Sequence, residues 1–128
     1  MFGTFQQSQI RIEVEASKET LGNSLLKTEQ LSQWLWFRRF SPGVPEQLQT
    51  GTTFTSWVGP VAIEHQVERA DEQTLRLLLS KGIDGYHEWY WGDRWVQSRI
   101  EGITLLPLNL GQTLSLLSLR QYVSLKAN

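Results

Sequence analysis

The first part of the chain alternates between hydrophobic and polar residues and then changes period. In QIRIEVEA, residues 9–16, every second side chain is apolar, and the intervening residues from Arg11 to Glu15 are charged. This period of two predicts a half-buried β-strand. Ser17 and Thr28 are then placed to cap two short helices, over 18–26 and 28–36, in which leucines recur four residues apart.

A series of β segments occupies the middle of the chain. After a mixed stretch interrupted by Pro42 and Pro45, the strand pattern returns. Its five segments are 52–59, 61–69, 74–81, 85–91 and 94–106. The breaks between them contain Gly, Pro and Asp, which are typical turn residues. Consecutive strands joined by short turns predict an antiparallel meander.

The last part of the chain returns to a helical period. Beyond Pro107, apolar residues recur along two lines of a helix, one through Leu114 and Leu117 and the other through Leu116 and Leu119. Such a wide apolar arc is unusual for a surface helix, so we expect the sheet to wrap around it.

This order of elements resembles the helix-grip fold of the START-like superfamily, which includes polyketide cyclases and dehydrases, lipid-transfer domains and pathogenesis-related plant proteins. The resemblance is carried by the strand 10–16 leading into Ser17, by the tryptophan-containing second helix that ends at 34–36, and by Gly51-Thr52-Thr53-Phe54. The last of these is similar to the family's G-T-x-F entry to the third strand. The likeness extends over nearly the whole chain.

The resemblance implies an α+β helix-grip fold in which a curved antiparallel sheet of about seven strands wraps around a long C-terminal helix. It also implies a single START-like domain over 1–128, with two short helices after the first strand. Members commonly enclose an apolar ligand between sheet and last helix, so a small hydrophobic ligand and no cofactor are implied. Intracellular fatty-acid-binding barrels also open with a strand and a helix pair but end on strands, so a strand at 112–125 would favour them.

Composition narrows the class of protein. The 128 residues are 40% hydrophobic and 20% charged, which is ordinary for a globular domain. A net charge of −1 argues against nucleic-acid binding, and the absence of cysteine removes disulfides and thiolate zinc sites. No signal-peptide pattern opens the chain and polar residues interrupt segment 103–125, so we expect no membrane span and a cytoplasmic location.

Alternation along GYHEWYWGDRW and the following strand predicts which side of the sheet faces inward. A two-residue hairpin at Gly92-Asp93 would pair Trp89 with Val96 and Tyr90 with Trp95. The less charged face, assigned to the interior, holds His87, Trp89, Trp91, Arg94, Val96, Ser98 and Ile100. The other face holds Tyr86, Glu88, Tyr90, Trp95, Gln97 and Arg99. The run of three leucines at 77–79 leaves the facing of segment 74–81 open.

The predicted inner wall is mostly apolar with a few polar groups, as small-molecule sites are. The candidate ligand-binding residues are Phe54, Ser56, Ile63, His65, His87, Trp89, Trp91, Val96, Ser98, Leu114 and Leu117. His65 and His87 could orient a ligand or act as general acid or base. Alternatively, each is a core histidine bonded to a neighbour, for instance His87 to Ser98. With Glu64 and Glu88 on the opposite face, no metal site is expected.

The pair Arg38-Arg39 could bind an anionic head group at the mouth of a cavity, or could form a solvated bend before Pro42.

Three hypotheses for the function of the protein stay open. The leading hypothesis is a binding protein for a small hydrophobic or aromatic ligand, lipid-like or polyketide-like. The second is a cyclase or dehydratase type of enzyme using His65 or His87, although no nucleophile elbow or phosphate-loop motif is present. The third is a non-catalytic interaction module with Tyr86, Tyr90 and Trp95 as docking face, for example in a homodimer.

Overall fold

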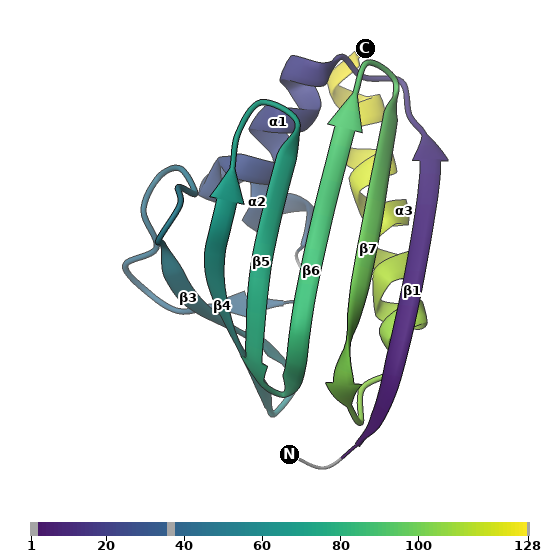
Figure 1. Ribbon diagram of the computed structural model, residues 1–128. Coiled ribbons are helices and arrows are strands. Elements are labelled where there is room, and N and C mark those ends of the chain that lie inside the picture. The colour runs from purple at the N-terminus through teal and green to yellow at the C-terminus, as the bar shows by residue number, and fades with distance from the viewer. Residues whose placement is uncertain (1–2, 36–37, 128) are drawn as a thin grey trace.

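The computed structural model describes residues 3–35 and 38–127 (Figure 1). The first half contains β1 (Thr4–Glu13), α1 (Lys18–Leu26), α2 (Thr28–Trp34), β2 (Arg39–Phe40), β3 (Thr53–Val58) and β4 (Val61–Ala70). The second half contains β5 (Thr74–Lys81), β6 (Ile83–Gly92), β7 (Trp95–Thr104) and α3 (Leu108–Ala127).

All seven of these strands form one antiparallel sheet in the order β1-β7-β6-β5-β4-β3-β2. The first strand closes the series by pairing with the last, from Thr4 opposite Thr104 to Glu13 opposite Trp95. The helices α1, α2 and α3 cover the same face of the curved sheet (Figure 1). This is the predicted α+β helix-grip fold, which is confirmed. The terminal helix also excludes the fatty-acid-binding barrel, because 112–125 is helical.

The two short helices are fixed by local hydrogen bonds. The Ser17 side chain accepts a bond from the backbone N–H of Thr20, which confirms the predicted cap of α1. Thr28 does not cap α2, since it is the first helical residue and its hydroxyl donates to the Pro45 carbonyl instead. The predicted second helix runs to Trp36, but the helix ends at Trp34 and Trp36 lies outside the described residues.

The hairpin between β6 and β7 differs from the predicted one by two residues. The closing pair is Gly92 with Trp95, so the turn is Asp93-Arg94 and Trp91, not Trp89, lies opposite Val96. Arg94 has a φ of 69° and is exposed, so it is not part of the inner rim. A shift of two residues leaves the other side chains of both strands on their predicted faces.

Contacts from the β1–α1 connection explain this turn. The Asp93 carboxylate accepts the backbone N–H of Lys18, and the Arg94 backbone bonds to Val14 and Ala16 in both directions. These long-range bonds hold Asp93 and Arg94 outside the ladder. Local turn preference for a leading glycine is therefore overridden by tertiary contacts.

The central strands bury every second side chain. In β5, Leu75, Leu77 and Leu79 are buried while Leu78 is 36% exposed, which settles the facing that the leucine run left open. Leu77 lies between Val67 of β4 and His87 of β6. None of the helices in the described part of the chain is long and apolar enough to cross a membrane.

Candidate functional site

A cavity of about 40 Å³ lies between the sheet and the three helices. Its apolar wall consists of Leu25, Leu31, Trp34, Leu35, Phe40, Leu48, Phe54, Leu75, Leu77 and Trp89. Its polar lining consists of Arg38, His65, His87 and Ser115. The rings of Trp34 and Trp89 pack in a T-shaped arrangement with their centroids 6.0 Å apart, so one corner of the wall is aromatic and closely packed.

His65 enters the cavity from β4 with one of its ring nitrogens unsatisfied. Its Nε2 lies 2.8 Å from Ser56 Oγ, and its ring stacks on Phe54 at 4.5 Å. Its Nδ1 is buried and has no hydrogen-bond partner among the described residues. Burial, followed by the charge of Arg38, lowers the pKa of His65 to about 3, so the imidazole is neutral at physiological pH.

His87 is held by a chain of hydrogen bonds that defines its proton position. Its Nε2 lies 2.7 Å from Ser98 Oγ, which confirms the predicted contact. Gln112 of α3 donates its amide to both the hydroxyl and the carbonyl of Ser98, at 2.9 Å each. Among its hydrogen-bond partners in the described chain, the Ser98 hydroxyl has only His87 Nε2 as an acceptor, which favours the tautomer of the neutral ring with its proton on Nδ1. Burial, then the charges of Arg38 and His65, lowers the pKa of His87 to about 3.

Arg38 is a cation at the cavity wall without an acidic partner. It follows α2, and its Nε is buried without a hydrogen-bond partner. Among residues 3–35 and 38–127, its side chain forms no ion pair. Burial lowers its pKa from the ordinary value. Arg38 lies in a bend before β2 and is half-buried, with its Nε buried beside the cavity, so the bend is not a fully solvated one.

The structure brings most of the predicted site residues together. Phe54, His65, His87 and Trp89 line the cavity directly. The buried interior around it contains Ser56, Ile63, Trp91, Val96 and Ser98.

Leu114 and Leu117 are the exceptions, with 49% and 52% of their surfaces exposed. Both were predicted from one of the two apolar lines of the terminal helix. The other line faces the sheet, since Leu116 and Leu119 are buried. Among the described residues of α3, Ser115 lines the cavity, and the predicted inward facing of Leu114 and Leu117 is wrong.

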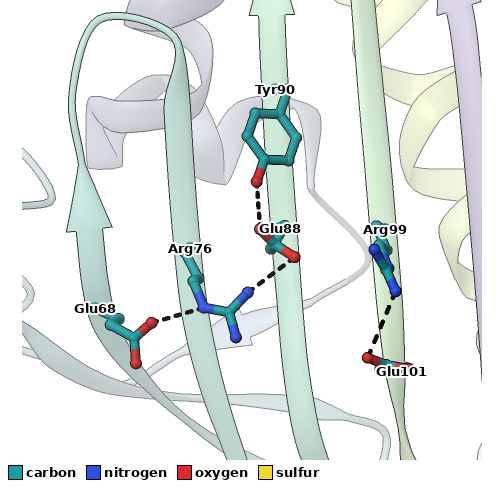
Figure 2. A network of polar contacts seen from close by, with 6 residues as sticks. All are labelled: Glu68, Arg76, Glu88, Tyr90, Arg99 and Glu101. Carbon is teal, nitrogen blue, oxygen red and sulfur yellow. Dashed lines mark hydrogen bonds and ion pairs between the residues drawn. The ribbon is translucent and has the colours of Figure 1, made fainter.

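The outer face of the sheet carries a separate polar network, shown in Figure 2. Arg76 of β5 bonds to Glu68 at 2.6 Å and to Glu88 at 2.8 Å, so one guanidinium bridges three neighbouring strands. The Tyr90 hydroxyl donates to the second oxygen of Glu88. This bond, with burial, raises the pKa of Tyr90.

Arginines of the sheet cover two of the outer aromatic rings. Arg76 lies 4.2 Å from the centre of the Tyr86 ring, and Arg11 lies 4.3 Å from that of Trp95. Such cation–π contacts satisfy aromatic faces within the chain itself. They support the interpretation that Tyr86 and Trp95 make cross-strand packing contacts on the outer face rather than form a docking surface.

Comparisons with known proteins identify the fold but no family. No family model matches the sequence, and no curated protein matches it. Among solved structures, CV1439 from Chromobacterium violaceum superposes with a TM-score of 0.72 at 16% identity, over 91% of this chain and 96% of its own. The protein therefore has the helix-grip architecture. Its similarity to these solved structures is one of fold and not of sequence.

Two further structures share this architecture. DynU16, a protein of the dynemicin biosynthetic locus, has a TM-score of 0.69 at 14% identity, over 92% of this chain and 47% of its own. Ara h 8.0201 has a TM-score of 0.67 at 10% identity, over 94% of this chain and 98% of its own. Identities this low show a shared fold, so function has to be argued from the site.

Proposed function

We propose that this chain is a START-like domain that binds a small apolar or aromatic ligand in the cavity between its sheet and its helices. One observation carries the proposal: the cavity has an aromatic wall, while two buried nitrogen atoms of its lining residues, Arg38 Nε and His65 Nδ1, have no hydrogen-bond partner in the described chain. Buried polar groups are almost always hydrogen-bonded in native proteins. Unpaired groups at one internal cavity are explained if a bound molecule completes them.

The size of the cavity limits what the ligand can be. At about 40 Å³, the closed cavity has room for a water molecule or a small head group. Typical ligand pockets measure roughly 300–1,000 Å³. A ligand with an aromatic ring therefore requires the wall side chains to move outward, and a small ligand is favoured over a long lipid.

The chemistry of the histidines supports binding over catalysis. A general acid or base works best when its pKa lies near the working pH. His65 and His87, with pKa values of about 3, stay neutral and are weak bases near pH 7. They are suited to orienting a ligand by hydrogen bonds, so the cyclase or dehydratase hypothesis takes second place.

A titration with benzamide, a neutral aromatic probe, tests this function. We expect benzamide to shift the NMR signals of the Trp34 and Trp89 indole N–H groups, which belong to the cavity wall. Ser115→Leu adds bulk to the cavity from α3 and should abolish these shifts. Thr113→Leu is the matched control, because Thr113 and Ser115 both bond to the carbonyl four residues back, but Thr113 does not line the cavity. Equal binding by both variants would contradict an internal site.

A further inference from the structure

Among the described residues, the cavity lining contains hydrogen-bond donors and a positive charge but no negative charge. Arg38 is the one charged side chain that residues 3–35 and 38–127 contribute to it. A guanidinium has five N–H donors and no acceptor, and a planar carboxylate matches its geometry. The buried Nε of Arg38 has no partner among the described residues, so at least one of these donors is available.

The two histidines add polar ring nitrogens to the lining of the same cavity. The Ser98 hydroxyl favours the His87 tautomer with its proton on Nδ1, and no hydrogen bond to that nitrogen is formed within the described chain. Ser56 bonds to Nε2 of His65, and the buried Nδ1 of His65 has no hydrogen-bond partner among the described residues. Ser115 offers nothing further, because its hydroxyl already donates to the Gly111 carbonyl at 2.9 Å.

Arg76 on the outer face is an example of an arginine with a structural role, and its charge is paired within the chain. Arg76 bonds to two carboxylates and covers the Tyr86 ring (Figure 2). Among the described residues, Arg38 has no carboxylate partner, and it lies half-buried at the wall of the cavity. A partly buried charge without a counter-charge loses hydration in the folded state, and an apolar residue of similar length would be less costly there.

We infer that the ligand carries a carboxylate, which binds Arg38 inside the cavity while its apolar part packs against Trp34, Phe54 and Trp89. This inference rests on the proposed function and specifies its ligand as a small carboxylic acid. The carboxylate of the ligand supplies the negative charge beside Arg38 that no described residue of the chain provides. A neutral histidine whose ring proton lies on Nδ1 can then donate a hydrogen bond to the bound carboxylate and orient it.

Benzoate and benzamide provide the test, because they have nearly the same shape and differ in charge. We expect the wild-type protein to bind benzoate at least about tenfold more tightly than benzamide, since charge-assisted bonds are the stronger ones. Arg38→Met should remove this preference and keep benzamide binding, whereas Arg38→Lys should retain part of it. Arg39→Met is the matched control and should behave like wild type, because Arg39 is exposed on β2 and lies over Trp57.

A second measurement separates a ligand-binding role of Arg38 from a structural one. Without ligand, the thermal midpoint of Arg38→Met should equal or exceed that of wild type, since an uncompensated charge has been removed. A lower midpoint together with an unchanged benzoate preference would overturn the inference.

The wild-type titrations alone also separate the two proposals. Equal affinities for benzoate and benzamide, with both lost in Ser115→Leu, would overturn the carboxylate inference and leave the cavity as a neutral ligand site. Binding of neither probe would overturn both.

Discussion

His65 and His87 show how single residues give this interior its chemical character. Each is buried, each bonds through Nε2 to a serine, and each lines the cavity. Their pKa values are lowered chiefly by burial and secondly by the charge of Arg38. Arg38, His65 and His87 can share this interior without charge repulsion only while both histidines are neutral.

The stability of the fold should therefore depend on pH through these two residues. Between about pH 6.5 and pH 3, an unfolded histidine is protonated and a folded one is not, so the unfolded state binds more protons. The free energy of unfolding should fall as pH decreases through this range, by up to about 1.4 kcal/mol per pH unit for each histidine. Urea unfolding at pH 7, 6 and 5 measures the slope.

Variants without these histidines supply the control for the pH slope. The chain has only 2 histidines, so His65→Gln combined with His87→Gln should flatten the slope above pH 5. Asp71, whose pKa is lowered mainly by the backbone N–H of Gln73, loses its contribution at lower pH and does not interfere there. A double variant with the same slope as wild type would contradict the assignment.

At the scale of secondary-structure elements, close approach of backbones shapes the sheet beside the site. Gly85 of β6 lies opposite Gly102 of β7. A Cβ at Gly85 would lie 1.9 Å from the Glu101 carbonyl oxygen, so no larger residue fits without moving the strand. By contrast, a Cβ at Gly111 in α3 would meet nothing within 4 Å.

These two glycines should respond to alanine in opposite directions. Gly85→Ala should destabilise the protein by about 1–3 kcal/mol, because β6 and β7 must separate to admit the methyl group. Gly111→Ala should stabilise it by up to about 1 kcal/mol, since alanine is the better helix former and the site is open. Chemical denaturation of both variants measures the changes. A stabilising Gly85→Ala would show that the two strands are farther apart than described.

At the scale of the whole molecule, the sequence predicts the architecture well because strand alternation has only two outcomes. The face of the sheet on which a side chain lies can therefore be predicted correctly even where the cross-strand pairing is not. In the β6–β7 hairpin, the turn is Asp93-Arg94 and not the predicted Gly92-Asp93. The phase of the terminal helix was less predictable, because both of its leucine lines are apolar and the sheet selects one of them. Leu116 faces inward and Leu114 does not.

The cavity itself depends on information that no local pattern contains. Arg38 is recognisable in sequence only as one of two adjacent arginines after a helix. Its burial follows from the way α2 and β2 meet the sheet, so its importance emerges from tertiary structure. The size of the cavity, about 40 Å³, likewise reflects how closely large side chains pack.

The most direct measurement of the central claim is the small-molecule content of the purified protein. Native mass spectrometry of the intact chain, beside analysis of an organic extract after denaturation, measures identity and stoichiometry together. We expect one carboxylic acid per chain in wild type and in Thr113→Leu, and none in Ser115→Leu. A wild-type protein empty in both measurements, or an equal amount of the same molecule on Ser115→Leu, would contradict a ligand site in the cavity.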